Sequence, residues 1–115
     1  MLSLPVQVRV FLCTQPTDMR RSFDGLAGMV QQVFDQDLLS GHLFVFVNRR
    51  RDRVKILGWD RDGLAIWYKR LEAGTFQLPS LRGGAVELDA AELAMMLGGI
   101  DLRSARRRKR YRRAG

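Results

Sequence analysis

Three short runs of β-branched and aromatic residues, separated by two polar turns, occupy the middle of this chain. They cover residues 43–47, 53–59 and 64–71, and they are rich in the residue types that strands favour. Connections as short as Asn48–Asp52 and Asp60–Gly63 join strands that pair antiparallel, because a parallel pair needs a much longer crossover. The sequence therefore predicts a three-stranded antiparallel meander. Its first strand, apolar on both faces, is expected at the centre of a sheet covered above and below.

The alternation within the meander gives a finer expectation. If Asp60–Gly63 forms a three-residue loop that ends in a glycine bulge, with Gly63 at positive φ, Lys55 and Lys69 lie opposite each other across two strands. Like charges in that position destabilise a sheet. Either an anion lies between the two lysines, or their flexible stems carry both ammonium groups into solvent.

The flanking segments supply further elements. An alternating run over residues 6–12 predicts a strand that joins the meander, and Ser22 is a candidate N-cap for a helix whose apolar stripe runs to Phe34. Short strands are expected over residues 75–78 and 86–88, and Asp89 with Glu92 has the spacing of a capping box before a last helix. We therefore predict one α+β domain over residues 1–102, an antiparallel meander sheet with two main helices packed on it.

The positive charge of the chain has a single location. Its formal net charge is +8, yet residues 1–102 hold equal numbers of acidic and basic side chains. The whole excess lies in residues 103–115, which contain eight basic residues and no acidic one. Such a block repels itself and buries little, so we expect a disordered arginine-rich tail whose natural partners are polyanions. A solvated terminus that only aids solubility is the alternative, but acidic residues serve that purpose better.

Catalytic signals are sparse. The one cysteine, Cys13, lies in an apolar run and is expected to be a buried structural thiol, in keeping with a reducing cytosol. The one histidine, His42, stands at a strand start, where we expect a structural role. The sequence has no nucleophile elbow, phosphate-binding glycine loop or zinc spacing, and no signal peptide or membrane-length apolar run. We therefore expect a cytoplasmic binding protein, without a cofactor or a metal, rather than an enzyme.

Several segments, in order along nearly the whole chain, resemble the TnpB accessory protein encoded by the second open reading frame of the bacterial insertion-sequence family sixty-six. The segments that carry the resemblance are residues 18–27 (DMRRSFDGLA), 41–46 (GHLFVF), 48–55 (NRRRDRVK), 59–63 (WDRDG), 67–72 (WYKRLE), 74–76 (GTF) and 99–102 (GIDL). The chain departs from the family at Gly58, where a bulky or aromatic residue is expected, and this predicts a notch beside Trp59. The resemblance implies a small protein that supports transposition beside a separate catalytic transposase.

These observations give a functional expectation. We expect an accessory factor that acts in insertion-sequence transposition by binding DNA, in particular the transposon ends, or by assembling the complex with the transposase of the same element. The candidate nucleic-acid contacts are all basic residues, namely Arg49, Arg50, Arg51, Arg53, Lys55, Lys69, Arg106, Arg107, Arg108, Lys109 and Arg110. Two other readings stay open. One is a protein-interaction module that binds the transposase without touching DNA, and the other is an arginine-rich RNA-binding protein.

Overall fold

A computed structural model describes residues 8–79 and 83–98 of the chain. Five strands form one sheet in the order β4-β3-β2-β1-β5. The strands are β1 (Val10–Cys13), β2 (Leu43–Val47), β3 (Arg53–Asp60), β4 (Gly63–Arg70) and β5 (Ala85–Leu88). The predicted meander is confirmed, since β2, β3 and β4 are successive antiparallel neighbours. The tail over residues 103–115 and its candidate contacts Arg106–Arg110 lie outside the described residues.

The sheet is mixed rather than antiparallel throughout. β1 runs parallel to β2, with Val10 opposite Leu43, whereas β5 returns antiparallel on the other side of β1. A parallel neighbour needs a long crossover, and residues 14–42 supply it with the first helical segment. The expectation of a purely antiparallel sheet was therefore wrong at its first strand, although the α+β class is correct.

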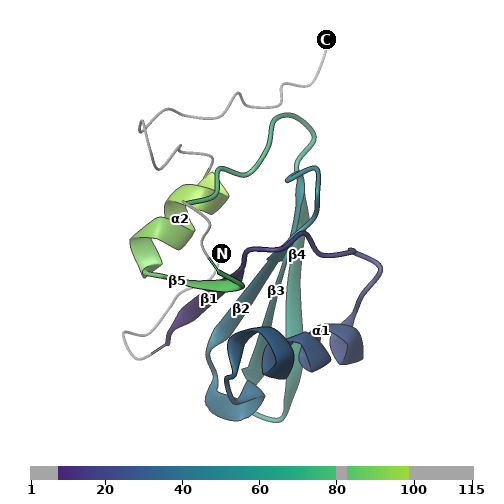
Figure 1. Ribbon diagram of the computed structural model, residues 1–115, viewed down its shortest axis with the longest axis vertical. Helices are drawn as coiled ribbons and strands as arrows, with labels where there is room; N and C mark the ends of the chain where they lie inside the picture. The colour runs from purple at the N-terminus through teal and green to yellow at the C-terminus, as the bar shows by residue number, and fades with distance from the viewer. Residues whose placement is uncertain (1–7, 80–82, 99–115) are drawn as a thin grey trace.

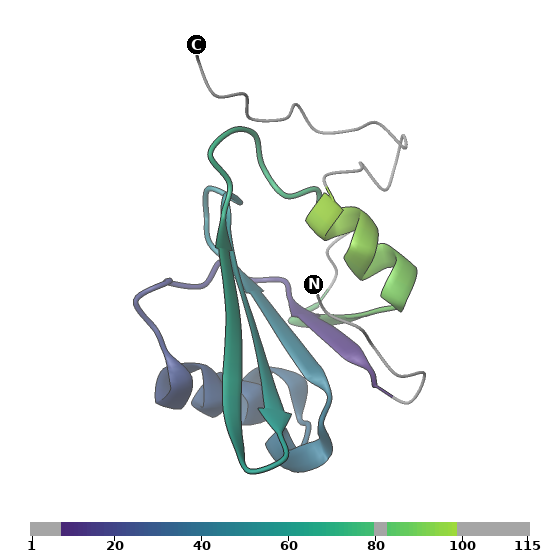
Figure 2. The ribbon, with the colours of Figure 1, turned by 180° about the vertical axis from the view of Figure 1, so that it is seen from behind.

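Helices cover opposite faces of the sheet (Figures 1 and 2). α1 (Phe23–Met29) continues into η1, a π-helix over Val30–Phe34, and a single 3-10 turn, η2 (Leu38–Ser40), precedes β2. α2 (Ala90–Gly98) follows β5 directly. Ser22 occupies the N-cap position of α1 as predicted, although its side chain makes no capping hydrogen bond. The capping box before α2 is confirmed in full, because Glu92 N donates to Asp89 Oδ1 and Asp89 N donates to Glu92 Oε1.

Each face of the sheet has its own apolar core, as the two-sided first strand of the meander predicts. On the α1 side, Leu26, Val30 and Phe34 pack against the inward side chains of β1 and β2, among them Phe44 and Phe46. Phe34 contacts both rings, with centroids 5.2 Å and 5.8 Å away. The α2 side consists mainly of Val, Ile, Leu and Met side chains: Val10, Leu12, Val45, Val47, Val54, Ile56, Phe76, Leu88, Leu93, Met96 and Leu97. Strands β2 and β1 are thus buried on both faces and fix the position of everything attached to their ends.

Two local expectations need correction. Asp60 pairs directly with Gly63, so the turn has only two residues, Arg61 and Asp62. Arg61, and not Gly63, takes the positive φ, of 55°. The shorter turn changes the register, so Lys55 lies opposite Tyr68 and Lys69 opposite Val54, on different faces of the sheet.

The strand predicted over residues 75–78 is also absent. The segment is irregular, but Phe76 is fully buried and its backbone N–H donates to Arg51 O at 2.7 Å. The side chain thus accounts for the apolar pattern without a strand, because it fills the core beneath α2.

Candidate nucleic-acid interface

A basic loop stands at one end of the sheet, between β2 and β3. The arginine loop, as we call residues 48–52 here, contains Arg49, Arg50 and Arg51, and all three are exposed. The carbonyl of Asn48 accepts a hydrogen bond from the backbone N–H of Arg51 at 3.1 Å, which closes a tight turn. Arg51 takes a φ of 60° there. The loop predicted from sequence is therefore present, and it presents its arginines to solvent.

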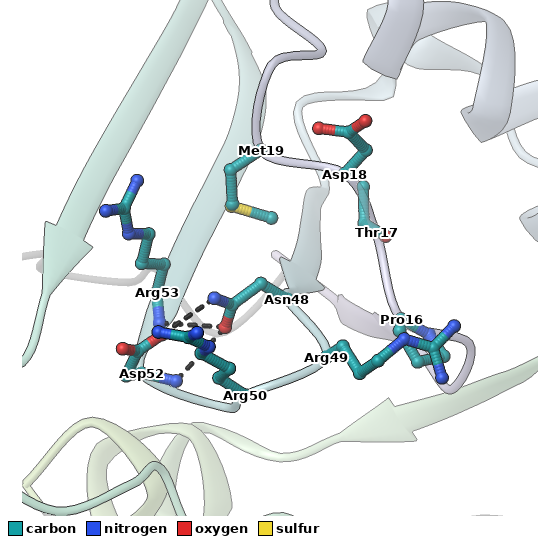
Figure 3. Close-up of a pocket in the computed structure, with 9 residues that line it drawn as sticks. All are labelled: Pro16, Thr17, Asp18, Met19, Asn48, Arg49, Arg50, Asp52 and Arg53. Atoms are coloured by element: carbon teal, nitrogen blue, oxygen red, sulfur yellow. Dashed lines mark hydrogen bonds between the residues drawn. The ribbon is translucent and has the colours of Figure 1, made fainter.

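The Asn48 side chain holds this turn from within (Figure 3). Its Oδ1 accepts hydrogen bonds from the backbone N–H groups of Asp52 and Arg53, both at 3.0 Å. Its Nδ2 donates to Asp52 Oδ1 at 2.7 Å. Asparagine suits this position because its short side chain can replace a backbone partner in a turn. One side chain thus fixes the backbone path of the whole loop.

Neighbouring segments hold the loop from outside. Leu71 N donates to Asp52 O and Phe76 N donates to Arg51 O, both at 2.7 Å. On the other side, Thr17 N donates to the carbonyl of Val47, the last residue of β2, at 2.9 Å. Because Phe76 is buried in the core and Val47 belongs to a central strand, the loop backbone is anchored to the core of the fold. Its arginine side chains are exposed, whereas its backbone is held by these hydrogen bonds.

The three loop arginines, like the exposed Arg21 and Arg61, have no acidic partner among the described residues. Arg9 pairs with Glu87, Arg20 with Asp18 and Arg70 with Glu72. Within residues 8–79 and 83–98, no ion pair or side-chain hydrogen bond engages the guanidinium groups of Arg49, Arg50 and Arg51. These three positive charges are therefore available to an external anion.

The remaining candidates fall into different places. Arg53 lies beside the loop, and its Nη1 donates to the Tyr68 hydroxyl at 3.3 Å. Lys69 is exposed on the opposite face, near the end of edge strand β4. Arg53 therefore adjoins the arginine loop, whereas Lys69 projects from the α2 side of the sheet.

Lys55 has a structural position that the sequence did not indicate. It is only 7% exposed, and its Nζ donates to the carbonyls of Met19 and Arg21 at 2.8 Å and 2.7 Å. The ammonium also lies 4.7 Å from the centre of the Tyr68 ring. No anion bridges two lysines, because Lys55 binds the chain that leads into α1 instead. Its side chain is no part of an exposed basic surface.

That chain segment forms a wall of an open cavity beside the loop (Figure 3). The loop cavity, as we call it, has a volume of about 510 Å³ and lies between residues 16–19 and the arginine loop. Its lining residues are Pro16, Thr17, Asp18, Met19, Asn48, Arg49, Arg50, Asp52 and Arg53. No local sequence pattern indicates this cavity, because its two walls are some thirty residues apart in the chain and are brought together at the end of β2.

The carboxylates of the loop cavity are engaged within the protein. Asp18 accepts a backbone hydrogen bond from Arg20 and pairs with its guanidinium, Oδ2 to Nη2, at 2.6 Å. These hydrogen bonds, first the side-chain one and then the backbone one, lower the pKa of Asp18 to about 2. The same pairing raises the pKa of Arg20. Asp52 is held by Asn48, as described above.

Cys13 and His42 both have structural positions. Within the described residues, no three His, Cys, Asp or Glu side chains are arranged to hold a metal ion. Cys13 is buried as predicted, with its Sγ directed to the Gln15 carbonyl at 3.5 Å. His42 has the structural role expected of it, because its Nδ1 accepts a hydrogen bond from Arg9 N. No helix within the described ranges is long and apolar enough to cross a membrane.

The fold and the site together define a small α+β protein with an anchored basic loop, and comparison with known proteins specifies its class. The chain belongs to the IS66 Orf2-like protein family, which matches residues 8–107, and is thus an accessory protein of insertion elements. It is 42% identical to the uncharacterized protein y4hO of Sinorhizobium fredii (strain NBRC 101917 / NGR234), over 90% of both chains. It is 33% identical to the uncharacterized protein y4jC of the same strain, over 88% of this chain and 86% of the relative. No solved structure matches it significantly. The resemblance noted in the sequence is thereby confirmed.

Proposed function

We propose that this protein is a non-catalytic DNA-binding factor that helps to assemble the transposition complex at the ends of its insertion element. The arginine loop and the basic segment 103–115 are its DNA contacts. The observation that carries the proposal is the combination of a fixed loop backbone with three exposed guanidinium groups that have no acidic partner in the described residues. Arginine in such a position can form bidentate hydrogen bonds with a phosphate group or with the edge of a guanine base.

The two basic regions have different tasks in this proposal. A cluster of eight basic residues in thirteen supplies charge to any duplex, through release of counterions from the phosphates it neutralises. An arginine held at a fixed position on a rigid sheet can select one arrangement of the DNA, because positioned side chains read base edges and groove shape. We therefore assign general affinity to residues 103–115 and preference for the element ends to the arginine loop.

The test measures affinity for a duplex from the element ends and for a scrambled duplex across a range of salt concentrations, by fluorescence anisotropy. Changing Arg106–Arg110 to glutamine should flatten the salt dependence for both duplexes. A slope of log affinity on log salt of roughly −4 to −7 should become smaller in magnitude by at most about 4. Changing Arg49 and Arg50 to Ala and Arg51 to Asn should cost more on the element ends than on the scrambled duplex. Asparagine at position 51 tolerates the positive φ found there.

The matched control is Arg61→Asn, which removes an exposed arginine of the same backbone conformation from the opposite end of the sheet. It should leave both affinities within about two-fold, since loss of one distant, screened charge changes little at physiological salt. A structured RNA of equal length serves as competitor. If that RNA displaces the DNA at lower concentration than unlabelled duplex does, the RNA-binding reading replaces this proposal.

A second candidate, direct contact with the transposase, is favoured by a different observation. An apolar hollow of about 200 Å³ lies on the α2 side of strands β3 and β4, around Gly58. Leu43, Ile56, Ala65 and Trp67 line it, with Trp59 and Asp60 at its end. The hollow includes Trp59, beside which a notch was predicted, although the Leu43 side chain lies directly over Gly58. The exposed edge strand β4 borders the hollow. Such a hollow beside an unpaired strand suits a protein partner.

Ala65→Glu tests this second candidate, because Ala65 is exposed and the substitution places a charge in the hollow without disturbing the core. It should abolish co-purification of the transposase of the same element and leave DNA affinity unchanged. Leu39→Glu is the control, since Leu39 is 59% exposed and lies outside the hollow. Equal co-purification of both variants with the transposase would exclude the hollow as the contact.

A further inference from the structure

The loop cavity is lined by arginine side chains that no acidic side chain of the described residues pairs with. Arg49, Arg50 and Arg53 line it together with two carboxylates. Asp18 pairs with Arg20, which is not among the lining residues, whereas Asp52 accepts a hydrogen bond from the neutral amide of Asn48 and keeps its charge. Of the three arginines, only Arg53 has a hydrogen-bond partner in the described part of the chain, the neutral hydroxyl of Tyr68. Three guanidinium groups thus share the lining with two carboxylates, of which Asp18 is already paired with Arg20, so a net positive charge remains in a cavity whose volume is in the range of small-ligand sites.

Thr17 adds an independent observation. It is only 4% exposed, and its hydroxyl is the buried side-chain polar atom that lacks a hydrogen-bond partner within residues 8–79 and 83–98. A buried hydroxyl without a partner is destabilising, so such groups in native proteins call for an explanation such as a bound ion. Its backbone N–H is already used by Val47 O. The hydroxyl is thus the free polar group of a residue that is otherwise fixed in the cavity wall.

We infer that the loop cavity is a discrete binding site for one phosphate group. Arg49, Arg50 and Arg53 neutralise its charge, and the Thr17 hydroxyl donates a hydrogen bond to one of its oxygens. Guanidinium groups are donors only, and a hydroxyl can donate as well, so these groups suit an acceptor-only ligand such as phosphate, while the Asp18 carboxylate of the same lining is already engaged by Arg20. The inference rests on the proposed function for the source of that phosphate, a DNA strand. A backbone phosphodiester and a 5′-terminal phosphate are the two sources, and the experiment separates them.

The first part of the test uses inorganic phosphate and no DNA. Phosphate is titrated into the full-length protein at constant ionic strength, with chloride as the matched salt, and amide resonances are followed by NMR. The amides of Thr17 and Asn48 should shift saturably with phosphate and not with chloride. Thr17→Val should weaken phosphate binding about ten-fold, the loss of one hydrogen bond to a charged group. Arg61→Asn, the control at the far end of the sheet, should bind phosphate as the parent protein does.

Thr17→Val is suited to this purpose because valine matches threonine in shape, keeps the backbone bond to Val47 and removes only the unpartnered hydroxyl. Its melting temperature should equal or exceed that of the parent protein. If the variant fails to fold, Arg53→Gln serves instead, because it removes a cavity arginine that is only half-buried. Shifts that do not saturate, or that are equal in parent and variant, would overturn the phosphate site.

The second part uses two duplexes of one sequence that carry either a 5′-phosphate or a 5′-hydroxyl. Tighter binding of the 5′-phosphate duplex, lost in Thr17→Val, assigns the site to a strand end. Equal binding of both duplexes, together with displacement by inorganic phosphate, assigns it to the internal backbone. Normal DNA binding by Thr17→Val, with no phosphate response at Thr17, would overturn the site and leave the proposed function intact. Phosphate binding without any DNA affinity would support the site and refute the proposed function.

Discussion

The two turns of the meander use the same residue types and have opposite properties. The arginine loop joins β2 to β3, and the Arg61–Asp62 turn joins β3 to β4 at the other end of the sheet. Each contains arginine and aspartate, and each places one arginine at positive φ, 60° for Arg51 and 55° for Arg61. The first turn is bonded through its own asparagine and through residues of two other segments, whereas the second is closed by its own strand pair.

The difference lies in what surrounds each turn rather than in its composition. Residues 71 and 76 reach the arginine loop because the chain returns past it after β4, and residues 16–19 reach it because the crossover begins there. The Arg61–Asp62 turn projects beyond the sheet at the far end (Figure 2). An arginine-rich turn becomes a positioned binding element only where other segments fix its backbone.

The largest expected effect comes from removing the inner support of the arginine loop. Asn48→Ala deletes three hydrogen bonds and leaves the partly buried backbone N–H groups of Asp52 and Arg53 without their acceptor. We expect a loss of about 2–3 kcal/mol of unfolding free energy, measured by urea denaturation. Asp62→Ala, in the other turn, should change it by less than about 0.5 kcal/mol. Equal losses of stability from the two substitutions would show that the arginine loop is held no more firmly than the Arg61–Asp62 turn.

A smaller effect should follow from Lys55→Met, which removes the support of the cavity wall. The carbonyls of Met19 and Arg21 lose their donor, and the methionine still fills the space beside Tyr68. We expect a cost of about 1–2 kcal/mol. Amide hydrogen exchange should increase over residues 17–22 and remain unchanged at Arg61 and Asp62. Unchanged exchange over residues 17–22 would show that Lys55 does not hold that segment.

The two arginines at positive φ offer a paired test. Arg51→Gly and Arg61→Gly both relieve a conformation that side chains disfavour, so each should gain up to about 1 kcal/mol of stability. Both substitutions make the same change to the backbone, but only Arg51 lies in the arginine loop. Only Arg51→Gly should therefore reduce DNA affinity, by a few-fold. If both glycine variants lower DNA affinity alike, the arginine loop has no special role.

The smallest expected effect is the dependence of stability on pH that arises from the lowered pKa of Asp18. Its pKa is lowered to about 2 by the hydrogen bonds from Arg20, against about 3.9 in an unfolded chain. A lowered native pKa contributes stability above pH 4 that is lost as pH falls towards 2. Arg20→Gln should return the Asp18 pKa towards its ordinary value, as measured by carboxyl carbon NMR titration. Persistence of a pKa near 2 in that variant would assign the shift to another group.

The sequence predicted those features that depend on neighbours along the chain. The meander, the α2 capping box, the buried thiol and the arginine loop all follow from local alternation, spacing and turn chemistry. Lys55 was misplaced because a turn one residue shorter than expected moves its partner from Lys69 to Tyr68. In a strand such a shift reverses which neighbours share a face.

Other features depend on contacts between distant segments, and local patterns contain no information about them. The parallel pairing of β1 with β2 and the irregular path around Phe76 are of this kind. The loop cavity is also of this kind. In the sequence Thr17 is an ordinary turn residue, and only its pairing with Val47 at the end of β2 places it in the cavity wall. Lys55 likewise reads as a solvent-facing strand lysine until the chain entering α1 covers it.

The position of β1 in the sheet has a consequence for biosynthesis. β1 is made first, yet one of its two neighbours, β5, lies more than seventy residues later, with Val10 opposite Leu88. During translation the meander can form while β1 still has an open edge, and that edge carries the buried side chains Val10 and Leu12. Closure of such long-range pairs is slow, and open strand edges promote aggregation. Folding yield should therefore depend on how promptly β5 leaves the ribosome and pairs with β1.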